Sequence, residues 1–138
     1  AQFLKDGSSS ELNVLRALQN VEVACCTQNF GFFKAMDGQT KAAAQKAYSA
    51  LLEDVMRKSA DGVDLLVLDE ALDALSKGLV DEALVDRALD MSARGVEVAL
   101  TGRAPSRKIV EKADYITEMR CEKHPYEQGI CAREGVEY

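Results

Sequence analysis

The sequence predicts an α/β protein with a mostly parallel β-sheet covered by helices on both faces. Short apolar runs alternate along the chain with longer amphipathic stretches, and this alternation is typical of such a fold. One run, residues 65–68, consists only of leucine and valine, as expected for a central strand buried on both faces. A chain of 138 residues is long enough for one hydrophobic core, so we expect residues 1–138 to form a single domain.

The N-terminal part is expected to contain two strands with a helix between them. Residues 2–4 and 21–26 are predicted to be the strands. Ser8 and Glu11 have the spacing of a capping box, which predicts that a helix begins there. The apolar positions that follow at helical intervals are Leu12, Leu15 and Leu18.

The clearest helix is predicted over residues 37–59. Its apolar positions fall on one helical face, and core packing is their simplest role. These positions are Ala44, Ala47, Tyr48, Leu51, Leu52, Val55 and Met56. The central strand at residues 65–68 comes next and stops at two acids, Asp69 and Glu70.

The second half of the chain predicts the remaining elements of the sheet. A helix capped by Asp81 is expected to end near Gly95, and residues 96–101 form the next predicted strand. A short helix through residues 109–110 leads to a last strand at residues 115–119. The tail is expected to turn around Pro125 and Gly129 and then to run extended.

The composition limits the possible partners. The net charge of −6 has the wrong sign for a large phosphate-binding surface, so we expect no nucleic-acid partner. A small anion remains possible where a few cations gather. No apolar run approaches the roughly 20 residues of a membrane-spanning helix. The N-terminus shows no secretory leader, so we expect a cytoplasmic protein with no membrane partner.

Four cysteines and one histidine raise the question of a metal site. Cys121, His124 and Cys131 could supply three zinc ligands, but no CxxC pair accompanies them. We therefore expect free thiols, with Cys25 and Cys26 near the core. His124 stands next to a proline and is expected to be structural rather than catalytic.

Two acids directly follow the central strand and suggest a metal site. In open α/β sheets, ligands bind at the carboxyl ends of the strands, which is where Asp69 and Glu70 are expected. Carboxylates suit Mg²⁺, which shares the rest of its shell with phosphates and water. This is the Walker B arrangement of nucleotide-hydrolysing folds. An acid that only caps the next helix is an equally good interpretation of these two residues alone.

Two further motifs are candidates for ligand binding. Thr101, Gly102 and Arg103 end the next predicted strand, so a close backbone approach and an arginine could serve a phosphate there. An exposed loop arginine is the simpler interpretation of this motif alone. Phe30, Phe32 and Phe33 lie in one loop, where aromatic side chains could bind a flat ligand or simply belong to the core.

Taken in order, these segments resemble the ATP:corrinoid adenosyltransferases, also called cob(I)alamin adenosyltransferases. The resemblance covers nearly the whole chain, and its most specific part begins at Thr101. The segments that carry it are Gln2-Phe3-Leu4-Lys5, Phe30-Gly31-Phe32, Leu66-Val67-Leu68-Asp69-Glu70, Thr101-Gly102-Arg103, Ala113-Asp114, Thr117-Glu118-Met119-Arg120, Lys123-His124-Pro125, and Gly129-Ile130 to Gly135-Val136-Glu137-Tyr138.

The resemblance implies a fold, a reaction and partners. The fold would be RecA-like, of the P-loop type, and the reaction would transfer the 5′-deoxyadenosyl group from ATP to the cobalt of a reduced corrinoid, in adenosylcobalamin synthesis or salvage. The acceptor would be cob(I)alamin or cob(I)yrinic acid a,c-diamide. Mg²⁺ is the implied cofactor, and a homodimer and an electron-donor flavoprotein are implied as partners.

The resemblance also implies roles for individual residues. Asp69 and Glu70 would bind Mg²⁺, and Thr101, Gly102 and Arg103 would contact the nucleotide, with Asp69, Glu70 and Arg103 as the catalytic set. Phe30 and Phe32 would face the corrinoid, although the family often has tryptophan at the position of Phe32. The cobalt is itself the nucleophile, so the protein needs to position the substrates and neutralise charge.

The sequence departs from the family at its front. Such enzymes carry a G-x-x-x-x-G-K-[ST] loop, but none of the nine glycines precedes a Lys-Ser or Lys-Thr pair. A fragment of a longer enzyme and a shortened relative that binds a corrinoid or a partner without catalysis both account for this. We favour the fragment, because loss of a first strand exposes the core, and we expect the chain alone to be inactive or impaired. A nucleotide hydrolase that uses the same acids is a further alternative.

Overall fold

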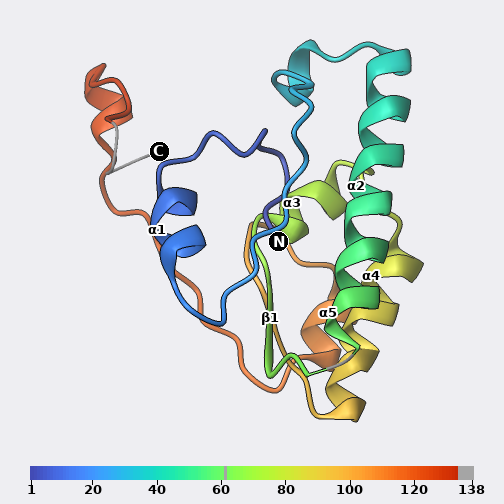
Figure 1. Ribbon diagram of the computed structural model, residues 1–138. Helices are drawn as coiled ribbons and strands as arrows, with labels where there is room; N and C mark the ends of the chain where they lie inside the picture. Colours follow the sequence, from blue (N-terminus) through green and yellow to red (C-terminus); the bar gives the residue numbers. More distant parts are fainter. Residues whose placement is uncertain (61, 134–138) are drawn as a thin grey trace.

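The computed structural model describes residues 1–60 and 62–133, which form an α/β structure. Within these residues, strands β1 (Leu65–Leu68) and β2 (Glu97–Leu100) pair in parallel, with Leu68 opposite Leu100. Figure 1 shows α2, α4 and α5 on one side of the strands and α1 on the other. The predicted α/β class and parallel pairing are therefore confirmed.

The predicted strands at residues 2–4 and 21–26 are present only as single bridges. Gln2 pairs in parallel with Cys25 on one side and with Asp69 on the other. The backbone N–H of Gln2 donates to the carbonyl of Ala24 at 2.9 Å, and that of Phe3 donates to the carbonyl of Asp69 at 2.9 Å. The extended run ends at Leu4, whose φ of +60° turns the chain away. The N-terminal segment thus extends the parallel arrangement beside the end of β1.

Helix α1 (Glu11–Ala17) confirms the predicted helix but not its capping box. Ser10 occupies the N-cap, and the Ser8 hydroxyl donates to Asp6 Oδ1 at 2.5 Å. Glu11 is the first helical residue, and its carboxylate accepts hydrogen bonds from Gln2 and Lys5. The capping box fails because stronger, charge-assisted partners occupy both of its side chains.

Helix α2 (Gly38–Ser59) confirms the long predicted helix. Asp37 is its N-cap and accepts a 2.7 Å hydrogen bond from the backbone N–H of Thr40. The predicted stripe faces the core, where Ala44, Tyr48, Leu52 and Val55 are buried and Leu51 and Met56 pack at its margin.

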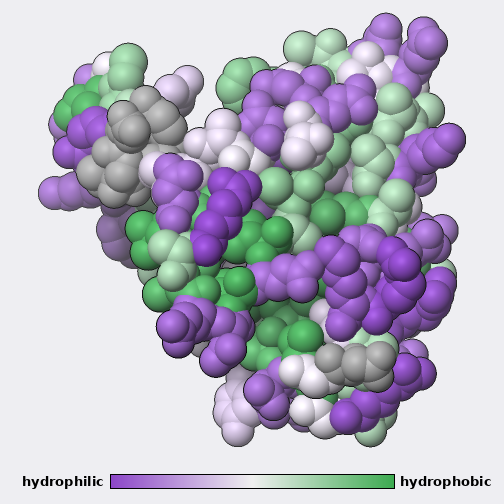
Figure 2. Space-filling view, viewed as in Figure 1, coloured by the Kyte–Doolittle hydropathy of each residue, from purple (hydrophilic) through white to green (hydrophobic). Residues whose placement is uncertain are grey.

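The prediction that β1 is buried on both faces is wrong. Leu66 and Leu68 are buried in the core with side chains from α2 and α4. Leu65 and Val67 point to the other face and are 58% and 39% exposed. The face of β1 that carries Leu65 and Val67 is therefore only partly covered. Hydrophobic surface remains visible in the lower centre of Figure 2, over the region where β1 lies in Figure 1.

The elements after β1 follow the prediction with one addition. Helix α3 (Ala71–Ser76) directly follows Glu70 and was not predicted, because it is only six residues long. Helix α4 (Glu82–Leu89) begins at its Asp81 cap, and the 3₁₀ helix η2 (Asp90–Arg94) continues to Gly95. Helix α5 (Arg107–Lys112) confirms the short predicted helix.

The last predicted strand, at residues 115–119, is wrong. Tyr115 and Met119 are 95% and 93% exposed, and within the described residues no ladder pairs this segment with a neighbour. An apolar β-type run becomes a strand only where a backbone edge meets it. The 3₁₀ helix η3 (Pro125–Gln128) and Gly129 form the predicted turn. The expected ending at residues 134–138 lies outside the described residues.

Among residues 1–60 and 62–133, no helix has both the length and the apolar character needed to cross a bilayer.

Candidate functional site

Asp69 and Thr101 meet at the carboxyl ends of the two strands. Each residue directly follows its strand, and the parallel register of β1 and β2 places them opposite each other. The Thr101 N–H donates to the carbonyl of Leu68 at 3.1 Å, which continues the ladder by one bond. The Thr101 hydroxyl then donates to Asp69 Oδ1 at 2.7 Å. The structure therefore brings together two of the predicted site residues.

The same hydroxyl also positions Glu70. The backbone N–H of Glu70 donates to Thr101 Oγ1 at 3.0 Å, so this oxygen connects both acids. Glu70 has φ +58°, a left-handed conformation that is unfavourable for a residue with a side chain. Residues held in this way often mark functional sites, because the surrounding contacts must impose the strain.

The carboxylate of Glu70 lies in a setting that disfavours its charge. Burial raises its pKa most, the Lys5 ammonium opposes that rise, and the carboxylates of Asp69 and Asp73 add to it, so the pKa lies above the ordinary value. Lys5 Nζ is 3.7 Å from Glu70 Oε1. Neighbouring carboxylates of this kind are stabilised by a cation.

Asp69 is held in place by neutral donors. Its Oδ1 accepts from the Thr101 hydroxyl, and its Oδ2 accepts from the Gln2 side-chain amide at 3.2 Å. Both donors orient the carboxylate without neutralising it. Gln2 was predicted only as part of a strand, because its contact with Asp69 depends on pairing between segments 67 residues apart.

Gly102 lies where a side chain would not fit. Its φ is +131°, and a Cβ atom there would come within 2.9 Å of Asp73 Oδ2 and of Leu72 Cβ. The backbone of Gly102 is therefore close to α3, while the predicted approach of a phosphate to this glycine stays a prediction. Asp73 also accepts from the Arg103 N–H at 2.8 Å and from Lys77 Nζ at 2.8 Å. The loop after β2 is thereby fixed to α3, while the Arg103 side chain is exposed.

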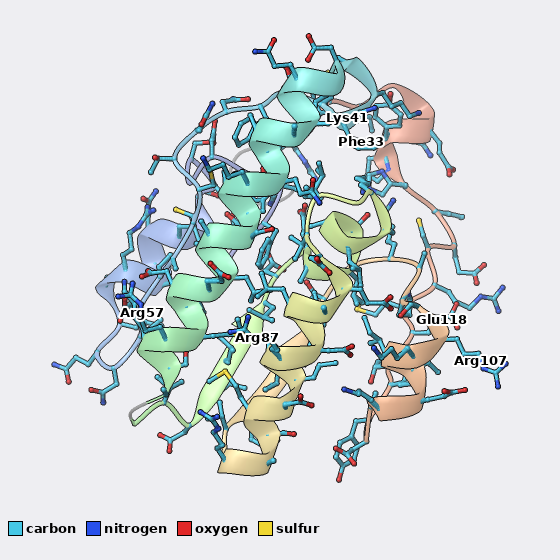
Figure 3. All side chains as sticks on the ribbon, turned by 90° about the vertical axis from the view of Figure 1, so that its right-hand side faces the viewer. Phe33, Lys41, Arg57, Arg87, Arg107 and Glu118 are labelled. Atoms are coloured by element: carbon cyan, nitrogen blue, oxygen red, sulfur yellow. The ribbon has the colours of Figure 1, made fainter. Side chains whose placement is uncertain are left out.

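The three loop phenylalanines lie in different environments. Phe30 packs edge-on against Tyr48 of α2, with ring centroids 5.8 Å apart. Phe33 lies under Lys41, whose Nζ is 4.7 Å from the ring centroid, and Figure 3 shows this pair at the start of α2. Phe32 is 89% exposed. Phe30 and Phe33 therefore contribute to packing, and Phe32 is free to meet a ligand.

Phe30 and Phe32 line a cavity of about 280 Å³ next to the acids. Its walls also carry polar side chains, and Lys5 belongs both to this cavity and to the ion pair with Glu70. Burial, with contributions from Cys26, Glu70 and Asp6, raises the pKa of Tyr48 to about 12, so its hydroxyl stays protonated. The lining residues are Leu4, Lys5, Asp6, Ser8, Ser9, Gln28, Asn29, Phe30, Gly31, Phe32 and Tyr48.

Another cavity, of about 350 Å³, lies between α2 and α4. Arg57 of α2 and Arg87 of α4 are among its lining residues. Figure 3 shows both of them far from Phe33 and Lys41, which lie at the start of α2. Arginines near helix C-termini complement the helix dipole, which gives these two residues a structural role.

The donor set fits Mg²⁺ better than zinc. Among the described residues, no three His, Cys, Asp or Glu side chains gather where they could hold a metal by themselves. His124 Nδ1 accepts from the Tyr126 N–H at 3.1 Å, and the four cysteines are free. His124 therefore caps η3, and the four cysteines form no disulfide with one another. Two carboxylates suit a Mg²⁺ ion, because it commonly takes one or two protein ligands and completes its shell with phosphates.

Comparison with known proteins connects this chain to one family. The family described as "ATP:corrinoid adenosyltransferase BtuR/CobO/CobP" matches residues 1–138. A corrinoid adenosyltransferase from Pseudomonas aeruginosa is 35% identical over 145 residues, which cover 99% of this chain and 67% of that protein. One from Sinorhizobium sp. is 40% identical over 75 residues, covering 54% of this chain and 35% of that protein.

The corrinoid adenosyltransferase of Escherichia coli K12 is 29% identical over 103 residues, covering 74% of this chain and 53% of that protein. The matches thus span between about a third and two thirds of these relatives' own lengths. The family match over the whole chain and the relative from P. aeruginosa agree with each other, and this chain belongs to the ATP:corrinoid adenosyltransferase family BtuR/CobO/CobP.

Proposed function

We propose that this protein transfers the 5′-deoxyadenosyl group from ATP to the cobalt of a reduced corrinoid. Family membership gives the reaction class, since the relatives carry the name corrinoid adenosyltransferase. The observation that carries the proposal is the Thr101 hydroxyl, which joins Asp69 and Glu70 where the two parallel strands end. That edge is where open α/β sheets bind their ligands.

The nucleotide would bind at this edge of the sheet. Asp69 and Glu70 would bind a Mg²⁺ ion, and Thr101, Gly102 and Arg103 would contact the nucleotide. The proposed nucleotide contacts are supported by the position of the loop after β2, which a hydrogen bond from the Arg103 N–H to Asp73 fixes beside the acids. A bound Mg²⁺ ion would supply charge neutralisation for the triphosphate. The protein residues would orient the two acids and present the exposed Arg103 side chain from a backbone that Asp73 fixes.

The corrinoid would lie on the aromatic side of the site. Phe32 is exposed and Phe30 lines the adjoining cavity, so both can contact a flat macrocycle. The electron pair of the reduced cobalt forms the bond to C5′ of ATP, while the C5′–O bond breaks and triphosphate leaves with that bonding pair. No protein nucleophile is needed, so the side chains act by positioning and by excluding water.

The finer features of the family belong to this proposal. They are a RecA-like fold of the P-loop type, one domain over residues 1–138, Mg²⁺ as cofactor, a homodimer, and an electron-donor flavoprotein that reduces the cobalt. A cytoplasmic location without nucleic-acid or membrane partners remains a prediction. The parallel pairing of β1 and β2 is the part of the structure most consistent with this fold.

The test is an anaerobic reaction of the purified full-length protein with Mg²⁺, ATP and chemically reduced cob(I)alamin. The cobalt absorption spectrum and the phosphate products are followed together. Formation of adenosylcobalamin with one equivalent of triphosphate supports the proposal. Release of orthophosphate without a cobalt–carbon bond would identify a nucleotide hydrolase. Corrinoid binding without any product would identify a binding protein, and either result contradicts the proposal.

A further inference from the structure

One carboxylate outside the proposed site is connected to both of its acids. Glu11, the first residue of α1, accepts two hydrogen bonds on the same oxygen, Oε1. One comes from Gln2 Nε2 at 2.8 Å and the other from Lys5 Nζ at 3.4 Å. Gln2 Nε2 also donates to Asp69 Oδ2 at 3.2 Å, and Lys5 Nζ is 3.7 Å from Glu70 Oε1. Two separate side chains therefore join Glu11 to the neighbouring acids Asp69 and Glu70.

Gln2 is the better-defined of the two connections. Gln2 is only 3% exposed. Backbone hydrogen bonds on both sides fix this segment between residues 24 and 69. The amide must direct its NH₂ group at the carboxylates, because the opposite orientation would place its oxygen against two negative charges. Its position and orientation are therefore determined by its surroundings.

This orientation has an energetic cost. Among the described residues, Gln2 Oε1 is a buried side-chain atom without a hydrogen-bond partner. Burying an unsatisfied acceptor costs about 1–3 kcal/mol. Two charge-assisted hydrogen bonds from the NH₂ group offset this cost, since such bonds are stronger than neutral ones. A leucine or methionine would fill the same buried position without that cost, so packing alone does not account for a glutamine here.

Lys5 connects Glu11 to the second acid and to the cavity. It lines the cavity of Phe30 and Phe32 while its ammonium lies between the carboxylates of Glu11 and Glu70. Burial raises the pKa of Glu11, but its own backbone N–H, the Gln2 amide and Lys5 outweigh this effect and hold the pKa below the ordinary value. Glu11 therefore competes with Glu70 for the Lys5 ammonium.

We propose that Glu11 is a positioning residue that, through Gln2 and Lys5, holds the carboxylates of Asp69 and Glu70 in the arrangement that binds a divalent cation. This inference rests on the proposed metal role of Asp69 and Glu70. Glu11 itself does not touch the ion, and α1 acts as the support from which the two acids are oriented. Groups in such supporting positions typically change metal affinity by about 10- to 100-fold.

The test measures the affinity for Mn²⁺ alone, from the electron paramagnetic resonance signal of the free aqua ion, with the full-length protein and no ATP or corrinoid. Glu11→Ala removes both contacts, and Gln2→Met removes the amide donors at nearly constant volume. Each is expected to weaken Mn²⁺ binding by about tenfold. Glu11→Gln keeps an oxygen that can accept from Gln2, so it should retain more affinity than Glu11→Ala. Glu53→Gln, on the exposed face of α2, is the matched control and should bind as tightly as the unsubstituted protein.

The outcomes separate this inference from the proposed function. Asp69→Asn tests the metal site itself. If the unsubstituted protein shows no saturable Mn²⁺ binding without ATP, this inference fails, because the two acids then do not bind the ion before the phosphates arrive. If Asp69→Asn leaves the binding unchanged, the metal role and this inference both fail. If Asp69→Asn weakens binding while Glu11→Ala and Gln2→Met do not, only the positioning role of Glu11 is overturned. Thermal unfolding of each variant shows whether a loss of Mn²⁺ affinity comes from unfolding. If Glu11→Ala is unfolded, Glu11→Gln decides whether Glu11 positions the acids, because a purely structural role would not place the Mn²⁺ affinity of Glu11→Gln between those of Glu11→Ala and the unsubstituted protein.

Discussion

The hydroxyl of Thr101 lies 2.7 Å from the carboxylate of Asp69, although the two residues are 32 positions apart in the chain. The same oxygen accepts the Glu70 N–H, so the single side chain that follows β2 fixes the acid pair that follows β1. Substituting Thr101 should therefore affect the site more than the fold.

Thr101→Val removes the hydroxyl and keeps the shape of the side chain. We expect a fall in adenosyl transfer of about tenfold or more, as for other residues that orient ligating groups. The free energy of unfolding should fall by about 1–3 kcal/mol, because the hydroxyl makes two hydrogen bonds and each has a net value of about 0.5–1.5 kcal/mol. Thr101→Ser restores the hydroxyl and should recover most of the activity; a serine variant as impaired as the valine variant would argue against the bridging role.

Gly102→Ala should destabilise the protein through the backbone and through a clash with α3. The left-handed region alone costs a residue with a Cβ about 1–2 kcal/mol. At Gly102 the added atom would also lie 2.9 Å from Asp73 and from Leu72. Gly78→Ala is the matched control, because its φ is +67° and an added Cβ would meet nothing within 4 Å. Urea denaturation should show a larger loss for Gly102→Ala, and equal losses would mean that α3 moves aside freely.

Glu70→Gln should stabilise the fold at neutral pH while it reduces metal-dependent transfer. The folded protein raises the pKa of Glu70 above its ordinary value of 4.5, mainly through burial, so the folded state binds the proton more tightly than the unfolded state. Ionisation of Glu70 therefore lowers stability as the pH rises through the folded pKa, and this loss is absent below 4.5.

The stability gain of Glu70→Gln over the unsubstituted protein should accordingly shrink as the pH is lowered from 7 towards 4. Chemical denaturation at several pH values measures this difference. Glu53→Gln, on the exposed face of α2, should show no comparable dependence. A gain for Glu70→Gln that is constant with pH would contradict the assigned cause.

The two cavity phenylalanines should respond differently to alanine substitution. Phe32 is 89% exposed, so Phe32→Ala should leave the melting temperature nearly unchanged and weaken corrinoid binding. Phe30 packs on Tyr48, so Phe30→Ala should also lower stability, by up to about 3 kcal/mol. Tyr115→Ala, at a 95% exposed aromatic position, is the control for removal of surface area. Corrinoid binding is measured by the change in its absorption, and unaltered binding by both variants would exclude this face.

Local patterns predicted most of the regular elements. The stripe of α2, the apolar run of β1 and the Asp81 cap each depend on residues close in sequence. The elements that failed depend on distant partners. Residues 115–119 have the composition of a strand but meet no pairing edge among the described residues, and the outer face of β1 stays partly exposed at Leu65 and Val67.

In the site, too, local patterns were predictable and contacts between distant segments were not. Asp69, Glu70 and Thr101 were predicted from their places at strand ends, since parallel strands bring those ends together. The contributions of Gln2, Lys5 and Glu11 could not be predicted, because they arise only when the N-terminal segment lies beside β1. Gly102 was predicted to allow a phosphate to approach its backbone, and its contact with Asp73 could not be predicted, because Asp73 belongs to a helix that the sequence pattern did not indicate.

The most direct test of the account is the anaerobic rate of adenosyl transfer by Asp69→Asn beside the unsubstituted full-length protein, with saturating Mg²⁺, ATP and cob(I)alamin. The asparagine keeps the size of the side chain and an oxygen for Thr101, but removes the charge that the metal role requires. We expect a fall of at least about tenfold in a protein that remains folded. Equal rates would show that Asp69 does not bind the ion and that the acid pair is not the reaction's metal site.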